Sequence, residues 1–189
     1  MKSFFVVIIA SLLSVSQVIA ADYVIDTKGA HASINFEIPH LGYSILVGRF
    51  DKFDGSFSYD AASPENASIS VTIDTTSLNS NHAERDKHLK GKDFLYVTEY
   101  PEATFKSTRY TATSDTEGEL AGTLTLRGVT KDIVIDVVKV GEGKDPWGGY
   151  RAGFSGSTSL KLTDFGIPTN LGPASQEVSL SLHIEGIRQ

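Results

Sequence analysis

The chain has 189 residues, of which 40% are hydrophobic, and a formal net charge of −6 at pH 7. This acidic balance argues against nucleic acid or anionic lipid headgroups as the main partner. The sequence has no cysteine, which excludes disulfides, thiol chemistry and a lipid anchor on an N-terminal cysteine.

The first 20 residues have the pattern of a secretory signal peptide. Lys2 precedes an apolar stretch from Phe4 to Val15, and Val18-Ile19-Ala20 provides a cleavage site. This stretch is too short and wrongly flanked for a membrane span, and no second apolar stretch of sufficient length follows. We therefore expect a signal peptide over residues 1–20 and a single domain over residues 21–189. The mature protein should be periplasmic, with no stable membrane span.

Apolar residues occupy every second position along most of the remaining chain. The alternation is clearest over residues 67–73, 152–162 and 178–184, and a period of two is typical of a sheet with one apolar face. With the turn residues between these runs, the pattern predicts strands over 22–27, 31–38, 43–59, 67–74, 102–111, 117–127, 129–140, 151–163 and 175–187. The 43–59 run changes phase between Phe50 and Phe53, so we expect a β-bulge inside it.

One segment, from Asn79 to Tyr100, breaks the alternation. Asn81 and Glu84 have the spacing of a capping box, which predicts a short helix near residues 82–90 that ends at Gly91. This helix would be polar on nearly all sides, so it cannot form a core. We expect it near the mouth of a barrel.

With so little helix to cover it, the apolar face of the sheet must be hidden by the sheet itself. The prediction is an all-β fold in which antiparallel strands close around an apolar lumen that can hold a lipid. Small residues interrupt the bulky ones on the inward phases and would leave room there: Gly48, Gly55, Ala103, Gly122, Ala152 and Gly156.

The sequence offers little for catalysis or metal binding. It has no Gly-x-Ser-x-Gly elbow, and its serines lie mostly on the polar phases of strands. His82 and His88 are six residues apart and would not share a helix face, and the other histidines are isolated in sequence. We expect no catalytic residues, no metal and no cofactor.

Several motifs resemble those of the YceI-like proteins. The most specific is the block Asn81–Lys90, followed by Asp93-Phe94-Leu95 and Tyr100–Phe105. Further matching stretches run in the same order through nearly all of residues 22–187, at 40–43, 124–131, 145–149, 152–154, 164–167 and 171–178. The resemblance implies an antiparallel, eight-stranded, lipocalin-like barrel in the periplasm. It also implies binding of a long-chain isoprenoid lipid, such as a polyprenyl diphosphate or a ubiquinone-like molecule, no established enzymatic activity, and a link to stress or alkaline pH.

The inward phases supply the residues that we expect to contact the lipid tail: Ile34, Phe36, Ile38, Phe105, Leu124, Leu126, Phe154, Leu160, Leu180 and Leu182. Arg49, Arg85 and Arg151 are candidates for the headgroup, because guanidinium groups pair with phosphate oxygens. The expected function is sequestration or transport of the lipid without catalysis. Two alternatives stay open, an enzyme acting on an isoprenoid or amphiphilic lipid and a small outer-membrane β-barrel. Exposed strand edges would permit a homodimer.

Overall fold

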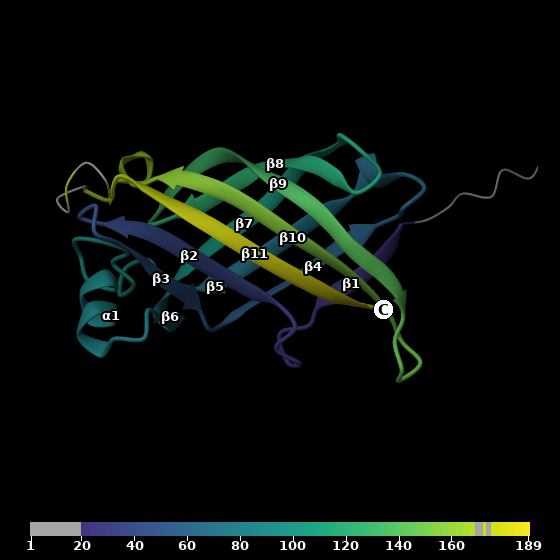
Figure 1. Cartoon of the computed structure of the whole chain (residues 1–189), viewed down its shortest axis with the longest axis horizontal. Helices are drawn as coiled ribbons and strands as arrows, with labels where there is room; N and C mark the ends of the chain where they lie inside the picture. The colour runs from purple at the N-terminus through teal and green to yellow at the C-terminus, as the bar shows by residue number, and fades with distance from the viewer. Residues whose placement is uncertain (1–19, 169–171, 173–174) are drawn as a thin grey trace, which may run out of the picture.

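In the computed structural model, residues 20–168, 172 and 175–189 are described, and they form an elongated barrel with a short helix at one end (Figure 1). All but the last residue of the predicted signal peptide lies outside these described residues. The elements within them are β1 (Ala21–Ile25), β2 (Ser33–His40), β3 (Ser44–Phe50), β4 (Phe53–Tyr59), β5 (Ser68–Asp74), β6 (Leu78–Asn79), α1 (Ala83–Leu89), β7 (Glu102–Ala112), β8 (Glu117–Leu126), β9 (Val129–Lys144), β10 (Tyr150–Lys161) and β11 (Glu177–Arg188). Short 3₁₀ turns lie at Pro64–Asn66, Thr75–Ser77 and Leu162–Phe165.

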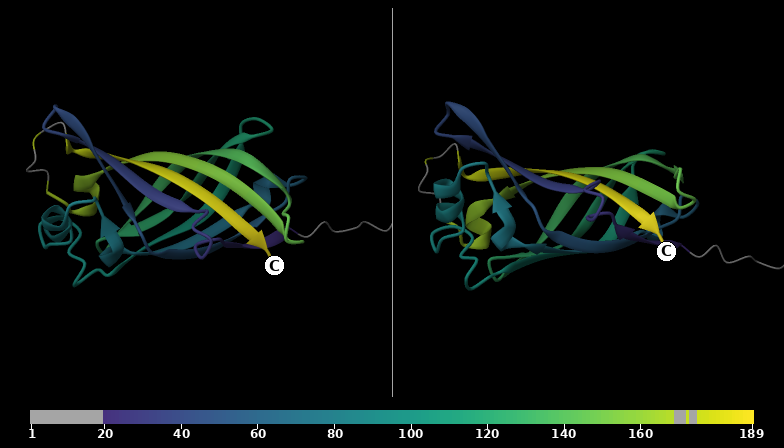
Figure 2. Two further views of the ribbon diagram at one scale, coloured as in Figure 1. Left: turned by 60° about the horizontal axis from the view of Figure 1, so that its bottom comes forward. Right: turned by 90° about the horizontal axis from the view of Figure 1, so that it is seen from below.

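The barrel is closed, antiparallel and eight-stranded. Its ring runs β1-β4-β5-β7-β8-β9-β10-β11, and β11 pairs back onto β1. Strand β11 also pairs with β2 through Ser179–His183. Further along the same edge, β11 pairs with Tyr23–Ile25 of β1. The hairpin of β2 and β3 therefore extends the wall beyond β1 and β4, and Figure 2 shows it projecting at the end that carries α1. The predicted fold class is confirmed.

The strand expected over residues 43–59 is in fact two strands, so the predicted bulge is wrong. The chain breaks at Asp51 and Lys52, where the Asp51 amide donates to the carbonyl of Ser77. Before the break, β3 follows β2, and after it β4 lies between β1 and β5. The change of phase marks a change of partner strands.

The helix is present, but its start differs from the prediction. His82 occupies the N-cap, and its Nδ1 accepts a hydrogen bond from the Arg85 amide at 3.2 Å. Asn81 has a φ of +61°, in the left-handed region, and is not the cap. Among the described helices, none is long and apolar enough to span a bilayer.

Several other strand bounds also differ from the sequence pattern by a few residues, and one short strand was not predicted. Strand β9 runs to Lys144 instead of residue 140, because its hairpin with β10 stays paired as far as Lys144 and Tyr150. Strand β10 stops at Lys161, where a 3₁₀ turn begins that Gly166 ends at a φ of +68°. Strand β6 has only two residues, too few for a periodic signal.

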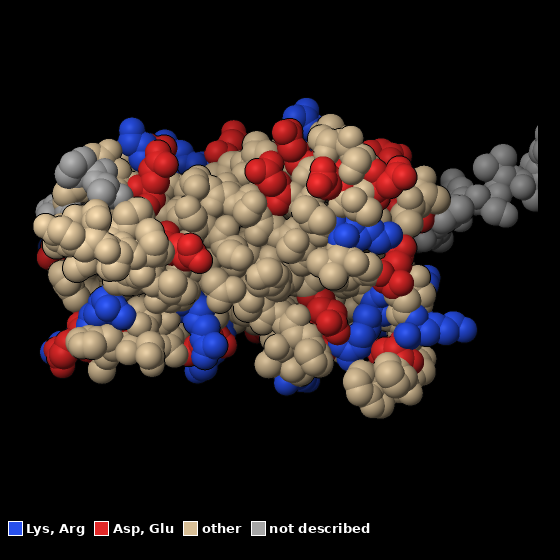
Figure 3. Space-filling model, in the orientation of Figure 1, with Lys and Arg blue, Asp and Glu red and all other residues tan. Residues whose placement is uncertain are grey.

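The alternating apolar side chains point into the barrel and pack as two clusters. One centres on Tyr23, Phe57 and Ala152, where β1, β4 and β10 meet. The other centres on Phe105, Leu124 and Phe165, nearer to α1. Outward positions in the middle of β10 and β11 are serine (Ser155, Ser157, Ser159, Ser179 and Ser181), and Figure 3 shows that the middle of this face carries few charged side chains.

Candidate functional site

The interior of the barrel is hollow. An inner cavity of about 140 Å³ lies within the ring of strands, and an outer cavity of about 280 Å³ lies between it and α1. Four side chains border both cavities, Ile34, Ile73, Leu124 and Leu180, which come from β2, β5, β8 and β11. The two cavities therefore adjoin at these four apolar residues, which we call the waist.

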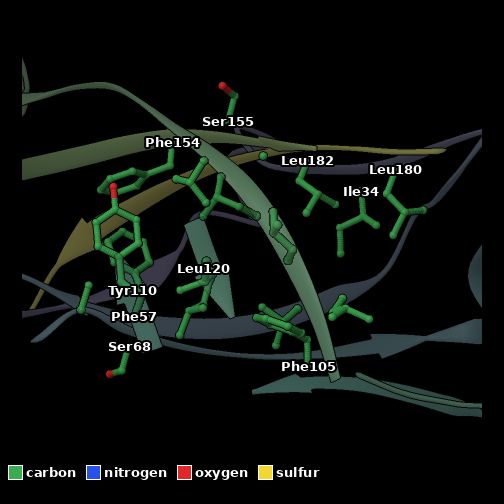
Figure 4. Close-up of a pocket in the computed structure, with 18 of the residues that line it drawn as sticks. Ile34, Phe57, Ser68, Phe105, Tyr110, Leu120, Phe154, Ser155, Leu180 and Leu182 are labelled. Atoms are coloured by element: carbon green, nitrogen blue, oxygen red, sulfur yellow. The ribbon is translucent and has the colours of Figure 1, made fainter. Parts of the chain in front are cut away.

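Every residue predicted to contact a lipid tail lines this space. Ile34, Leu124 and Leu180 lie at the waist. The inner cavity is bordered by Phe105, Phe154 and Leu182 (Figure 4), and the outer cavity by Phe36, Ile38, Leu126 and Leu160. Their contact with a ligand stays a prediction.

Three of the glycines that the sequence predicted to leave room in the lumen lie at its wall in two different arrangements. Gly48 lies beneath the ring of Phe36, and Gly122 lies beneath the ring of Phe105, so close that a Cβ at either glycine would overlap the ring. Each ring therefore occupies the space that a side chain of the neighbouring strand would otherwise take. Gly156 acts differently, because it borders the inner cavity directly.

The outer cavity carries the polar groups. His40, Arg85, His88 and Ser175 border it alongside the apolar wall. Arg85 donates from Nε to Ser80 Oγ at 2.8 Å and from Nη2 to the Ser80 carbonyl at 2.5 Å. Among the described residues, Nη1 has no hydrogen-bond partner. The Arg85 side chain is thus held at the cavity by its Nε and Nη2 groups, and its Nη1 group keeps hydrogen-bond donors for a ligand.

The inner cavity ends in aromatic rings. Phe154 makes edge-on contacts with Phe57 and Tyr59, with centroid distances of 5.6 and 5.0 Å. Beyond them Lys139 lies with its Nζ 5.1 Å from the Tyr59 ring centroid and 2.8 Å from Glu142 Oε1. Burial opposes the charge on Lys139, but the hydrogen bonds to Glu142 and Tyr59 outweigh it, so its pKa is raised. This end of the lumen is filled.

Two of the three headgroup candidates lie elsewhere. Arg49 points away from both cavities and pairs with Asp51 at 2.6 Å. Arg151 lies at the end of the barrel opposite α1, where it bridges Asp26 (2.7 Å), Glu185 (2.5 Å) and Asp145 (3.0 Å). The structure therefore brings only Arg85, of the three, to the cavity.

The Arg151 network also contains a group of potential metal ligands. Atoms of Asp26, His31 and Glu185 lie within 4.8 Å of one another. The guanidinium of Arg151 already supplies positive charge to both carboxylates, and its hydrogen bond to Asp26 holds the pKa of that carboxyl well below its usual range. We interpret this group as an ion-pair network that ties β1 to β10 and β11.

Part of the lining was missed by the sequence prediction. Ile69, Val71 and Ile133 follow the same period of two as the predicted residues, so the alternation could have identified them. Phe94 and Ile167 come from irregular segments and close the wall near α1. Their sequence carries no periodic signal.

The fold and the site together define a class: hollow antiparallel barrels whose lumen is apolar and whose polar groups gather at one end. Residues 23–186 match the family described as "YceI-like domain". The chain belongs to this family.

Relatives and solved structures agree with this assignment. A "UPF0312 protein" of Azotobacter vinelandii is 57% identical over 180 residues, covering 95% of this chain and 94% of the relative. The YCEI protein of Campylobacter jejuni is 33% identical, with a TM-score of 0.73, over 80% of this chain and 90% of that one. The structure called a polyisoprenoid binding domain from Saccharophagus degradans has a TM-score of 0.64 at 17% identity, over 90% of this chain and 99% of that one.

Proposed function

We propose that this protein binds a long-chain isoprenoid lipid in its lumen and stores or carries it in the periplasm, without making or breaking bonds. The observation that carries the proposal is the pair of adjoining cavities, whose walls come from the apolar faces of the barrel strands. The structural neighbour described as a polyisoprenoid binding domain supports the ligand class. The signal-peptide pattern supports export.

The polarity of the lumen supports one orientation of the lipid. The inner cavity is bordered almost entirely by hydrocarbon, whereas Arg85, His40 and His88 border the outer cavity. The tail would therefore extend past the waist into the inner cavity, and the headgroup would stay near α1. A diphosphate there would accept hydrogen bonds from Arg85, which already borders the cavity.

Burial of the tail supplies the binding free energy. Each methylene removed from water contributes about 0.8 kcal/mol, so one isoprene unit gains a few kcal/mol before ordering costs. Units that stay outside the lumen gain nothing. Affinity should therefore increase with tail length until the lumen is full.

The two alternatives have weaker support. An outer-membrane barrel carries its apolar side chains outward, whereas here they line the interior. An enzyme acting on the same lipid would use the titratable groups of the outer cavity, His40 and His88. It would show turnover of a polyprenyl diphosphate that is lost when either histidine is replaced.

Mass spectrometry of an organic extract tests the proposal. We expect isoprenoid lipid in the purified wild type and much less in Leu180→Trp, because the larger side chain narrows the waist. Ser179→Trp, at an exposed position of the same strand, is the matched control and should retain the lipid. If the folded wild type carries no isoprenoid and does not take up an added polyprenol, the proposal is wrong.

A further inference from the structure

The inner end of the lumen is closed by a side chain that crosses it. Phe154 projects from β10 and contacts Phe57 and Tyr59 of β4. In the ring of strands, β10 and β4 are separated by β11 and β1, so these contacts pass through the barrel interior. Figure 4 shows Phe154, Tyr110 and Phe57 gathered at one end of the cavity, away from Ile34 and Leu180.

The two rings that Phe154 contacts are held in place by other groups. Phe57 stacks on Tyr23 with centroids 4.8 Å apart and an interplanar angle of 8°. The Nζ of Lys139 lies 5.1 Å from the centroid of the Tyr59 ring. Phe57, Tyr59 and Tyr110 border the same end of the inner cavity, and Phe154 is the ring that reaches them from β10, so a tail in this cavity would end against Phe154 and these rings.

From this arrangement we infer that Phe154 is the specificity-determining residue that sets the maximum length of the isoprenoid tail. The inference rests on the proposed function and adds which residue limits the length of the lipid tail. A tail longer than the lumen would leave its extra units in water at the α1 end, where they gain no binding free energy.

The spacing of inward residues on β10 gives the size of the expected effect. Inward side chains are two residues apart, about 6.6 Å along the strand, and the tilt of barrel strands reduces this to about 5 Å along the axis. One isoprene unit adds four chain carbons, also about 5 Å when extended, since each bond is about 1.5 Å. Moving the end of the cavity by one inward position should change the tail length that fills the lumen by about one unit.

Strand β10 has one further inward position on each side of Phe154, at which the tail could end instead. Ala152, the next inward residue toward the filled end, is 1% exposed and small. Gly156, the next inward residue toward the mouth, borders the inner cavity, where a Cβ would lie 3.0 Å from Ile135 Cγ2 and 3.4 Å from Leu182 Cδ1. Phe154→Ala should lengthen the cavity that is available to the tail, and Gly156→Val should shorten it.

Competition among polyprenols tests the inference. Delipidated wild type, Phe154→Ala, Gly156→Val and the outward control Ser157→Val are each mixed with an equimolar ladder of polyprenols differing by one isoprene unit. The retained lipids are then identified by mass spectrometry after gel filtration. We expect the tail length at which retention stops increasing to rise by about one unit in Phe154→Ala, fall by about one unit in Gly156→Val, and stay unchanged in Ser157→Val.

The outcomes separate this inference from the proposed function. If folded Phe154→Ala and Gly156→Val both bind polyprenols with the wild-type length preference, the inference is overturned while the proposed function stands. If the wild type retains no polyprenol of any length, both fail. If Phe154→Ala does not fold, the milder Phe154→Leu and the opposite shift in Gly156→Val decide the result.

Discussion

The two ends of the barrel are built from different interactions. At the end opposite α1, charged and aromatic side chains are held in networks: Arg151 bridges three carboxylates, and Tyr23 stacks on Phe57. At the α1 end, one edge of β3 pairs with β2 along its length. The other edge of β3 pairs with β6 only through Arg49 and Phe50. The remainder of that wall is completed by irregular segments that contribute Phe94 and Ile167.

This difference separates the end of the barrel that stabilises the fold from the end through which a ligand would enter. The filled end has non-local contacts that fix the ring of strands, so we expect it to open last. The α1 end has polar groups, a sparsely paired strand and exposed apolar residues on the β2–β3 hairpin, among them Tyr43 at 87% exposure. Changes to the Arg151 network and the Tyr23–Phe57 stack at the first end should mainly affect folding, and changes at the second should mainly affect the affinity for the ligand.

The largest stability effect is expected at Asp26. Its carboxylate accepts hydrogen bonds from Arg151, His31 and the Gly29 amide. In Asp26→Asn the charge is lost and an amide NH₂ must face one of these donors, which should cost about 2–3 kcal/mol of unfolding free energy. Urea unfolding of the wild type and the variant measures this loss of unfolding free energy. Arg49→Gln is the control from the α1 end, where an exposed ion pair should contribute under about 1 kcal/mol. Equal losses in the two variants would remove the proposed difference between the ends.

Asp26 also predicts the response to acid. Hydrogen bonds, first from Arg151 and then from His31 and Gly29, hold its pKa well below the ordinary carboxyl value of 3.8. A carboxyl whose pKa is lowered by folding contributes stability that is complete above the unfolded pKa and is lost as the pH falls through the folded pKa. Below about pH 4, the unfolding free energy of the wild type should therefore fall more steeply than that of Asp26→Asn. Unfolding curves at a series of pH values check this, and parallel pH dependences would contradict it.

Much of the lumen could be predicted because the period of two is a local property of a strand. Once the alternation is seen, Ile34, Phe36 and Leu182 must share a face whichever strands lie beside them. The partners of a strand are not local. The break between β3 and β4 and the ion pair of Arg151 with Asp26, which is 125 residues away, depend on how the ring closes.

The position of the headgroup candidates shows the same limit. Arg49, Arg85 and Arg151 have equivalent chemistry in the sequence. Only the fold decides that Arg85 borders the outer cavity, because the segment that carries α1 lies across that end of the barrel.

At the α1 end, Gly48→Ala should reduce lipid binding more than stability. The new Cβ would overlap the ring of Phe36, and no backbone atom is among its nearest neighbours, so the ring must turn into the outer cavity. Loss of the volume for about two methylenes corresponds to about a tenfold weaker affinity for a polyprenol. The double variant Gly48→Ala with Phe36→Leu should recover most of this loss, because leucine leaves the space free. No recovery would mean that the displaced ring is not the cause.

The smallest effect is expected at Arg85 and should depend on the headgroup. A diphosphate would gain a charge-assisted hydrogen bond from the guanidinium, whereas a polyprenol has no anionic group to pair with it. Since the site is partly exposed to solvent, Arg85→Gln should weaken binding of a polyprenyl diphosphate by about fivefold, near 1 kcal/mol, and leave a polyprenol of equal tail length unchanged. Titration calorimetry with both lipids measures the difference, and Arg49→Gln, outside the cavity, should alter neither affinity. Equal losses for both lipids would mean that Arg85 supports the cavity wall, through its hydrogen bonds to Ser80, instead of the headgroup.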